Sequence, residues 1–412
     1  MSSVSVARNC CSSWRLAQDN NRAVHSWSTL NPARHEFYLS KTLRSSSSRL
    51  RKSHLSKQRL RSNGNGSEGR EKGKTSENER DQHLVSFSET DHKSQGLTSL
   101  FHKQPVSVNI GTLSSYEQEE LAVDGGISSG RFVLEADEVQ ELKNSTGLSE
   151  DELLLHLVSP AATLARPPVS LFHVGAVGLG ASGRAFVGIN LEFRRLPLSC
   201  SVHAEQFLVV NLLHHGEEAL RTIAVSAAPC GYCRQFYSEL ACAAGVRFIF
   251  GSGSYTLDEL LPQRFRPQDL LGEPPPPLLL EPQDNPVRLA PGSEAAAAEL
   301  LNSGGPLALA ARQALEQARR SYAPYSGCPA GLGIVAEDGR VYSGAYIESA
   351  AYNPSLPPLQ SALVSALVQG MPSYQRVTEV ILAERSGVEV RHAAATELML
   401  SQIAPHAPLR VL

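Results

Sequence analysis

The sequence predicts an α/β protein with two tandem domains, each a mixed β-sheet layered with helices. Three observations indicate this arrangement. Strand-like apolar runs alternate with segments of helical spacing, a block near the C-terminus repeats an earlier one, and a proline-rich stretch separates the two blocks. We expect a disordered extension over 1–130, a first domain over 131–255, a connection over 256–300 and a second domain over 301–412.

The N-terminal extension differs from the rest of the chain in charge. Residues 1–62 contain twelve of the 38 Lys and Arg residues but two of the 41 acidic ones, so residues 63–412 carry a net charge of −13. A Ser- and Arg-rich, acid-poor start is typical of an organelle transit peptide, and an untargeted solvated tail explains it equally well. The acidic remainder disfavours nucleic acid as a partner.

Hydropathy and cysteine content restrict the class further. No run approaches the roughly 18–20 apolar residues that span a bilayer, so we expect a soluble protein without a membrane partner. The seven cysteines are odd in number and unevenly spaced, which indicates reduced thiols and not a disulfide framework.

The elements of the first domain follow from periodicity and turn residues. Residues 138–142 and 149–155 have helical spacing, and Ser149 with Glu152 forms a capping-box pattern. The sequence then predicts strands over 171–177 and 186–193 joined by a Gly-Ala-Ser-Gly turn, a helix over 201–213, a buried strand over 222–227 and a helix over 230–242. The second domain opens on a helix over 307–320.

A metal-binding pattern lies within the first domain. His203 and Glu205, followed by Pro229, Cys230 and Cys233, form the H-x-E and P-C-x-x-C spacing of zinc deaminases that act on nucleobases. Pro229 is expected at the first helical position, with both cysteines in the first turn. Two thiolates and one imidazole leave tetrahedral Zn²⁺ one open position for water. Glu205 is then the catalytic proton shuttle for the zinc-activated water.

Two other interpretations of these residues stay open. A purely structural zinc site needs a fourth ligand, and Cys200 and Cys242 are the nearby thiols, although we expect both to be small buried apolar residues. The C-x-x-C pair alone also occurs in thioredoxin-like redox proteins. Arg234, next to Cys233, is expected either to steady the thiolates or to make a surface ion pair.

An internal repeat indicates that the second block lacks the metal-binding pattern. A shift of 156 residues, without any gap, places Pro168, Ser170, Gly175, Gly183, Arg184, Gly188 and Glu192 on Pro324, Ser326, Gly331, Gly339, Arg340, Gly344 and Glu348. The same shift places His203 on Leu359 and Glu205 on Ser361, and no cysteine follows Cys328. We therefore expect the second domain to be a zinc-free degenerate copy.

From about residue 131 to 412 the chain resembles the cytidine deaminases of the two-domain, homodimeric type found in plants and some bacteria. The resemblance covers nearly all of the ordered chain and is carried by the two metal segments and by 171–176, 188–193, 260–265 and 346–354. It implies Zn²⁺ as the cofactor, a nucleoside as the small-molecule partner, a homodimer, and the cytosol as the location, with plastid or mitochondrial import as the alternative.

The resemblance also implies substrate contacts. Asn190 and Glu192 match the pair that holds the ribose 3′-hydroxyl, although Glu192 has the copy Glu348 in a block without the metal pattern, which favours a partly structural role. Phe172 matches the aromatic residue that packs on the pyrimidine. His173 stands where the family usually carries Asn, and we expect a hydrogen-bonded polar residue more than a fourth ligand.

Further pocket residues are implied by the same resemblance. Ala204 and Ala228 match positions whose backbone groups bind the base and its amino group. Ala351 and Tyr352 match residues that complete the pocket of the partner subunit. The expected reaction is hydrolysis of cytidine and 2′-deoxycytidine to the uridine counterparts with release of ammonia, in pyrimidine salvage. The alternatives are a nucleotide or polynucleotide deaminase, a non-catalytic zinc module, and a silent paralogue.

Overall fold

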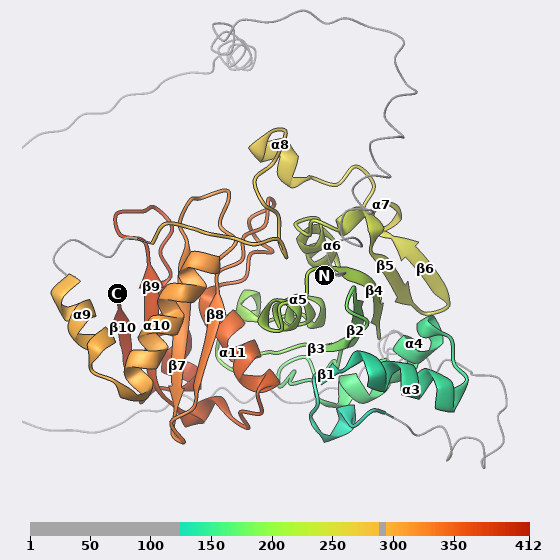
Figure 1. Ribbon diagram of the computed structural model, residues 1–412, viewed down its shortest axis with the longest axis horizontal. Coiled ribbons are helices and arrows are strands. Elements are labelled where there is room, and N and C mark those ends of the chain that lie inside the picture. Colours follow the sequence, from blue (N-terminus) through green and yellow to red (C-terminus); the bar gives the residue numbers. More distant parts are fainter. Residues whose placement is uncertain (1–123, 288–293) are drawn as a thin grey trace, which may run out of the picture. The chain divides into compact units, whose positions relative to one another are not determined.

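The computed structural model describes residues 124–287 and 294–412 (Figure 1). Most of the predicted disordered extension over 1–130, and with it the transit peptide and the localisation, concerns residues 1–123, which lie outside the described residues. Its last part is ordered, because residues 124–130 are described and contain the short helix η2 (Ile127–Ser129). Among the residues that are described, no helix is long and apolar enough to cross a membrane.

The first domain is built on a six-stranded sheet with the strand order β1-β3-β2-β4-β5-β6. All neighbouring strands are antiparallel except β4 and β5. The elements are η2 (Ile127–Ser129), β1 (Val133–Leu134), α3 (Ala136–Thr146), α4 (Glu150–Thr163), β2 (Gly175–Gly180), β3 (Ala185–Ile189), η3 (Leu198–Cys200), α5 (Ala204–His214), β4 (Leu220–Val225), α6 (Gly231–Tyr237), η4 (Ala243–Gly245), β5 (Arg247–Phe250) and β6 (Gly253–Thr256).

The second domain contains a four-stranded sheet with the order β10-β9-β7-β8. Its elements, with the helices that precede it, are α7 (Leu257–Leu260), α8 (Pro267–Leu271), α9 (Glu294–Asn302), α10 (Gly305–Arg320), β7 (Ala330–Ala336), β8 (Val341–Ala345), α11 (Pro358–Val368), η5 (Tyr374–Arg376), β9 (Val377–Glu384), α12 (Ala393–Ile403) and β10 (Leu409–Val411). Only the pair β9–β10 is parallel in this sheet.

The duplication inferred from the sequence is visible in the packing. The order β3-β2-β4-β5 of the first sheet recurs as β8-β7-β9-β10, with the same parallel and antiparallel pairs. A Cβ added to Gly175 would lie 2.5 Å from Ala162 N of α4, and one added to Gly331 would lie 2.2 Å from Ala318 N of α10. Gly331 follows Gly175 by 156 residues, and Ala318 follows Ala162 by the same number, so the two contacts are equivalent. The two predicted tandem domains are confirmed.

Local sequence signals place the start of α4 correctly. Ser149 Oγ accepts from Glu152 N at 3.4 Å while Glu152 Oε2 accepts from Ser149 N at 2.9 Å, as the capping-box pattern predicts. The Gly-Ala-Ser-Gly turn between β2 and β3 is also present, with Gly183 at φ 87°, a conformation that glycine adopts without strain.

Several predicted element boundaries differ from the structure: β3 ends at Ile189 instead of residue 193, and α5 begins at Ala204 instead of residue 201. Two further boundaries differ because of contacts distant in sequence. The strand expected from residue 171 begins at Gly175, since the preceding backbone bonds to the side chain of Asn190 instead of to a neighbouring strand. The helix expected over 230–242 ends at Tyr237. Beyond it, Leu279 donates to Glu239 O at 3.0 Å and accepts from Ala241 N at 3.1 Å, which pairs this backbone with the connecting segment.

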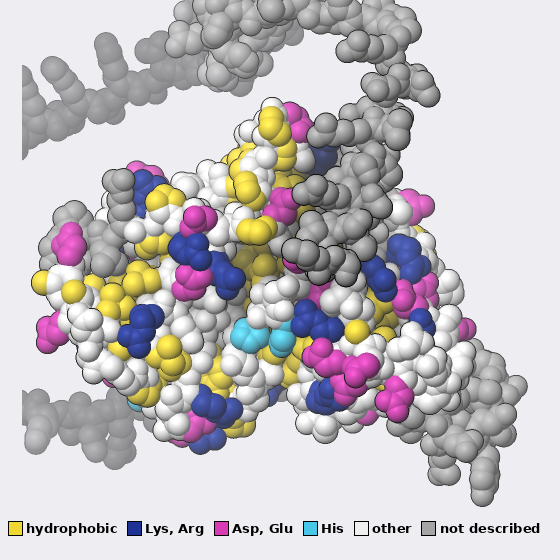
Figure 2. Space-filling view, viewed as in Figure 1, with side chains coloured by type: hydrophobic (Ala, Val, Ile, Leu, Met, Phe, Trp, Pro, Cys, Tyr) yellow, Lys and Arg dark blue, Asp and Glu magenta, His cyan; other side chains and the backbone are white. Residues whose placement is uncertain are grey.

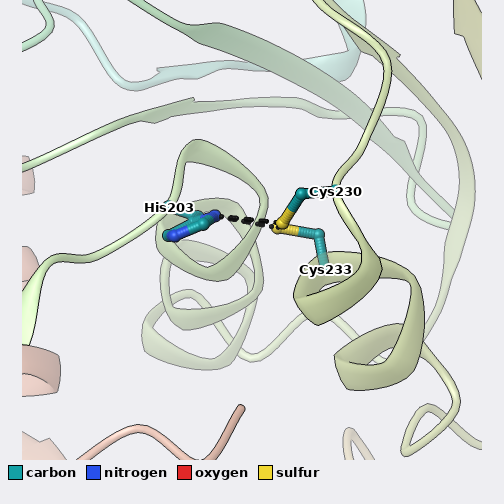
Figure 3. Close-up of side chains that lie close together, drawn as sticks. All are labelled: His203, Cys230 and Cys233. Carbon is teal, nitrogen blue, oxygen red and sulfur yellow. Dashed lines mark hydrogen bonds between the residues drawn. The ribbon is translucent and has the colours of Figure 1, made fainter. Parts of the chain in front are cut away.

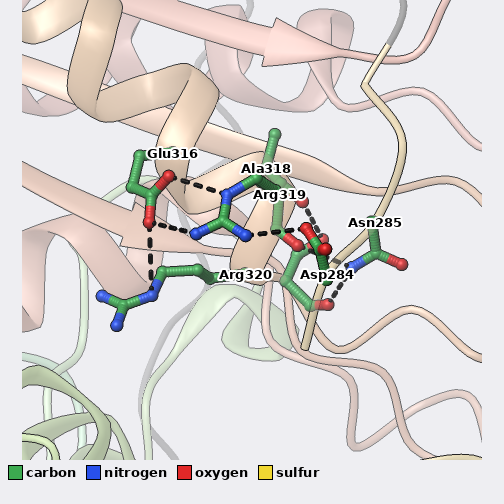
Figure 4. Close-up of polar contacts among 7 residues, drawn as sticks. Asp284, Asn285, Glu316, Ala318, Arg319 and Arg320 are labelled. Carbon is green, nitrogen blue, oxygen red and sulfur yellow. Dashed lines mark hydrogen bonds and ion pairs between the residues drawn. The ribbon is translucent and has the colours of Figure 1, made fainter. Parts of the chain in front are cut away.

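The connecting segment is tied to the second domain as well. Asn285 donates from its backbone N to Arg319 O at 2.7 Å and from Nδ2 to Ser321 O at 2.6 Å, at the C-terminal end of α10 (Figure 4). Arg319 also bonds to Asp284 and to Glu316. The bonds from Asn285 satisfy carbonyl groups that the end of a helix leaves without partners.

Helices α5 and α11 lie next to each other (Figure 1). Each is buried along almost its whole length, from Ala204 to Leu212 in α5 and from Pro358 to Leu367 in α11. The largest hydrophobic cluster of the described residues takes members from both domains. Helix α5, which begins after His203 and contains Glu205, is therefore packed inside the protein. This packing holds both residues in position.

Candidate metal centre

Two helix N-termini meet at the candidate metal centre. His203 is the N-cap of α5 and Cys230 is the N-cap of α6, with Cys233 one turn further along (Figure 3). Helix α6 therefore begins one residue after Cys230, and Pro229 lies before the helix, so the prediction that Pro229 occupies the first helical position was wrong. The positive end of each helix dipole favours negatively charged ligands at this point.

The three predicted ligands are brought together by the fold. Nδ1 of His203 lies 3.4 Å from Sγ of Cys230 and 3.4 Å from Sγ of Cys233, and the two sulfurs are 3.6 Å apart. Among the described residues this is the one group of three His, Cys, Asp or Glu side chains placed to hold a metal ion. Two sulfurs and one imidazole nitrogen are the donor set of a zinc site with an open position.

The thiols of the pair differ in acidity. The side-chain hydrogen bond with Cys233 lowers the pKa of Cys230 to about 3, with a further contribution from His203. The same hydrogen bond and burial raise the pKa of Cys233 well above its usual value. The site therefore holds one thiolate readily, and Cys233 becomes a ligand when a cation replaces its proton.

Glu205 lies in the first turn of α5 and is 5% exposed. Burial raises the pKa of its carboxyl group. The hydroxyl of Tyr237, from α6, donates to the backbone carbonyl of Glu205 at 3.2 Å and so joins the two helices beside the metal ligands. A carboxyl group with a raised pKa next to a metal site can both accept and deliver protons near neutral pH.

The two predicted ribose ligands bond to their own loop. Glu192 accepts from Val169 N at 3.0 Å, from Ser170 N at 2.8 Å and from Ser170 Oγ at 2.6 Å. Asn190 accepts from Val174 N at 2.9 Å and donates to Phe172 O at 2.9 Å. Both residues thus hold the loop that carries Phe172.

The second domain repeats the Glu192 arrangement. Glu348 accepts from Tyr325 N at 2.8 Å and from Ser326 N at 3.2 Å, and Ser326 Oγ also donates to it. All of these positions are 156 residues from their first-domain counterparts. The carboxylate therefore has a structural function in both copies.

The remaining predicted pocket residues are spread over several loops. Phe172 is 60% exposed and Tyr352 is 66% exposed, whereas Ala204 is buried, Ala228 is exposed and Ala351 is half-buried. These loops present aromatic rings at the surface.

The sequence left the roles of several other side chains near the motif undecided. His173 is exposed and is not among the grouped ligands. Cys200 and Cys242 pack against the hydrophobic core and are also outside the group. Arg234 bonds neither to a thiol nor to a carboxylate; it donates to Pro229 O and Leu260 O, each at 2.7 Å.

Comparison with known proteins assigns this chain to one family. Two family profiles, both described as the cytidine and deoxycytidylate deaminase zinc-binding region, match residues 148–248 and 257–397. "Cytidine deaminase 1" of Arabidopsis thaliana is 42% identical over 301 residues, covering 68% of this chain and 96% of the relative. The chain belongs to the cytidine deaminase family.

A bacterial relative and a solved structure are also similar to this cytidine deaminase. The cytidine deaminase of Klebsiella pneumoniae subsp. pneumoniae is 39% identical over 281 residues, covering 68% of this chain and 89% of the relative. The solved cytidine deaminase of Mycobacterium tuberculosis is 28% identical, with 29% of this chain and 98% of that chain covered and a TM-score of 0.27. The relatives and the profiles together identify the chain as a zinc-binding cytidine deaminase.

The fold gives His203 a different second-domain counterpart from the predicted Leu359. The bridges Leu191–Val202 and Ile347–Leu356 are equivalent, so the shift is 154 here and His203, the N-cap of α5, corresponds to Pro357, the N-cap of α11.

The sheet register of this deaminase does not extend to the two cysteines. Ala176 pairs with Val225 in the first sheet, and Leu332 pairs with Leu382 in the second, so the shift is 156 for the first residue of each pair and 157 for the second. Beyond the strands no single shift holds, because α6 begins six residues after the end of β4 whereas α12 begins nine residues after the end of β9. No cysteine follows Cys328 in the sequence. Gly387 and Val390, between β9 and α12, line a cavity of about 490 Å³ next to Cys328.

The sequence did not indicate two buried polar residues that bridge the domains. Gln206, adjacent to Glu205, donates to Pro354 O at 2.8 Å. Glu239, which follows α6, accepts from Ala350 N at 2.7 Å. A polar residue inside an apolar segment is a signal that a buried partner exists, but the partner itself cannot be identified without the fold.

Proposed function

We propose that this enzyme hydrolyses cytidine and 2′-deoxycytidine to uridine and 2′-deoxyuridine with release of ammonia, and that it serves pyrimidine salvage. The observation that carries the proposal is the group of His203, Cys230 and Cys233 beside the buried Glu205. Zinc bound by these three ligands would lower the pKa of water from about 15.7 to about 7.

Glu205 is the proposed proton shuttle. It takes a proton from the attacking water and delivers protons to the ring nitrogen and to the departing ammonia. Its burial excludes competing water, and the hydroxyl of Tyr237 holds its backbone in place. Proton transfer by a positioned side chain contributes about 10²–10⁴-fold to a rate.

The proposed substrate contacts come from several segments of the first domain. Phe172 offers an exposed ring to the pyrimidine, and Ala204 and Ala228 offer backbone groups to the base. Asn190 and Glu192 hold the loop that would lie against the ribose, with the Glu192 carboxylate disfavouring a phosphate. A nucleoside is therefore preferred to a nucleotide.

A homodimer is part of the proposal. Large apolar side chains are exposed in the same segments that carry the proposed pocket, namely Val169, Leu171, Phe172, Tyr232, Phe265 and Tyr352. Figure 2 shows hydrophobic side chains gathered over the segment of α8 as well. Exposed apolar groups of this kind are typical of interaction surfaces. We infer that Ala351 and Tyr352 complete the pocket of a partner subunit.

One experiment tests the function and the number of sites. The purified full-length chain is analysed for zinc per chain and for ammonia release from cytidine, 2′-deoxycytidine, cytidine monophosphate and single-stranded DNA. We expect one zinc per chain, because the second domain lacks counterparts of the ligands, and turnover of the two nucleosides only. Comparable turnover of the monophosphate or of DNA would refute the nucleoside proposal, and two zinc ions per chain would refute the zinc-free second domain.

A further inference from the structure

The loop over 349–354 is held by two buried side chains of the first domain. Gln206 Nε2 donates to Pro354 O at 2.8 Å, and Glu239 Oε1 accepts from Ala350 N at 2.7 Å. Gln206 is 6% exposed and Glu239 is fully buried. The two bonds lie on either side of Tyr352, so the loop is fixed at both ends.

Both anchoring residues belong to the segments that carry the metal ligands. Gln206 follows Glu205 in α5, and its Oε1 accepts from the backbone N of His203 at 3.3 Å. Glu239 comes two residues after α6, the helix that begins next to Cys230. The elements that hold the metal ligands therefore also hold the second-domain loop.

Hydrogen bonds accepted by Glu239 compensate for the burial of its carboxylate. Its other oxygen, Oε2, accepts from the hydroxyls of Tyr322 at 3.0 Å and Tyr325 at 2.5 Å, both from the second domain. A buried carboxylate is costly unless it is fully hydrogen-bonded, and a satisfied one specifies a single arrangement of its donors. Loss of this carboxylate would leave Ala350 N and two hydroxyls without their acceptor.

The residue between the anchors is in an unfavourable conformation. Tyr352 has φ 61°, in the left-handed region that bulky side chains rarely adopt, and its ring is 66% exposed. Such a conformation persists only where the surrounding structure imposes it. Two bonds within the loop contribute, from Tyr352 N to Ser349 O at 2.8 Å and from Ser355 N to Tyr352 O at 2.9 Å. The anchors at Ala350 and Pro354 hold that loop against the first domain.

We propose that Glu239 and Gln206 are positioning residues that clamp loop 349–354, so that Tyr352 projects outward and sets nucleoside binding in the pocket of a second copy of this chain. The inference rests on the proposed homodimeric nucleoside deaminase. It gives the catalytic domain of each subunit a part in building its partner's pocket, through the loop that it holds.

The first test measures the steady-state kinetics of the full-length Glu239→Gln variant. A glutamine amide nitrogen cannot accept a hydrogen bond, so either Ala350 N or the tyrosine hydroxyls lose their acceptor. We expect KM for cytidine to rise about tenfold, with kcat within about twofold of wild type and one zinc per chain. An unchanged KM, or loss of zinc, would overturn the inference.

Glu217→Gln is the matched control. Glu217 is a carboxylate 4% exposed in the same domain, and it accepts from Ser182 N at 3.0 Å and from Arg184, away from the loop. Its substitution removes an equally buried charge, so we expect a lower Tm but a wild-type KM. A similar rise of KM in this control would show that general destabilisation is the cause and would overturn the inference.

Mixed dimers separate an effect on the partner from an effect within the chain. A Glu205→Ala chain and a Glu239→Gln chain are co-expressed with two affinity tags and purified over both. The working site then lies on the Glu239→Gln chain and meets the intact loop of the other, so we expect KM to return to the wild-type value. A KM that stays raised would overturn the inference, because Glu239 would then act on its own site.

A second variant provides an independent test in case Glu239→Gln folds poorly. Gln206→Met removes the donor to Pro354 O, and we expect the same rise of KM and the same recovery in mixed dimers; failure of either would overturn the inference. Wild-type chain that does not turn over cytidine would instead refute the proposed function, and this is measured before any variant is compared.

Discussion

Glu205 owes its chemistry to its surroundings more than to its residue type. The side chain is 5% exposed, and burial raises the pKa of the carboxyl group. It follows the N-cap ligand His203 by two residues, so the helix start that positions the ligand also positions the carboxyl group. The proposed metal binding and the proposed proton transfer are thus linked through a single helical turn, although they are separate functions.

Replacement of Glu205 by Gln should separate these two functions. The variant keeps all three ligand atoms, so we expect zinc content equal to wild type and a fall in kcat of at least about 100-fold, the lower range for loss of a positioned acid-base group. Metal analysis and ammonia release on the same sample provide the measurement. Activity within tenfold of wild type would contradict the assignment of Glu205 as proton shuttle.

Contact between strand β3 and helix α5 sets the position of the helix that carries the site. A Cβ added to Gly188 would lie 2.1 Å from Ala204 O and 2.8 Å from Leu208 Cβ. Only glycine allows the strand to approach the first turn of α5 so closely. The second domain has the same requirement on another helix, where Gly331 lies against α10.

Gly188→Ala should therefore damage stability and activity together. The added methyl group forces the first turn of α5 away from β3, and overpacking of this kind costs about 1–3 kcal/mol. We expect a lower Tm, reduced zinc content and a fall in kcat/KM. The measurements are thermal unfolding, metal analysis and kinetics at a temperature where the variant is folded.

Gly331→Ala is the control for that prediction. Its Cβ would lie 2.2 Å from Ala318 N, a clash as severe as the first, but α10 carries none of the proposed site residues. Its Tm should fall while zinc content and kcat/KM of the folded protein stay at wild-type values. Equal loss of activity in both variants would show that stability alone controls the site.

At the scale of the whole molecule, the two domains share one interior. Helices α5 and α11 lie against each other and are buried along nearly their whole length, and His214 Nδ1 of α5 lies 3.3 Å from Ser365 Oγ of α11. The second domain thus covers the outer side of the helix that carries His203 and Glu205. It supports the site even though its own counterpart of His203 is Pro357 and no cysteine follows Cys328.

A chain that stops at residue 287 should consequently fail to form a stable site. Its α5 would expose apolar surface, and each Å² of such surface costs about 25 cal/mol. We expect fragment 124–287 to be poorly soluble and without zinc when expressed alone, and residues 294–412 in co-expression to restore both properties. A soluble, zinc-bound 124–287 fragment with wild-type kcat would contradict this dependence.

Much of the fold could be predicted because its signals are local. The capping pattern at Ser149 and Glu152 and the turn at Gly183 depend on residues a few positions apart, and both are found in the structure. The repeat predicted two domains, since equal spacing of glycines reflects equal helix-on-strand packing. The end of α6 was misplaced, because Leu279, some forty residues away, pairs with the backbone after Tyr237.

Residue spacing along the chain is enough to predict the donor set of the metal centre. His203 with Glu205, and Cys230 with Cys233, each lie within one helical turn, so their spacing alone brings each pair to one place. The contacts that hold this centre, in contrast, depend on the folded arrangement of the whole chain. Glu239 and Gln206 look like ordinary polar residues in the chain, and they reach Ala350 and Pro354 only because folding joins segments 111 and 148 residues apart.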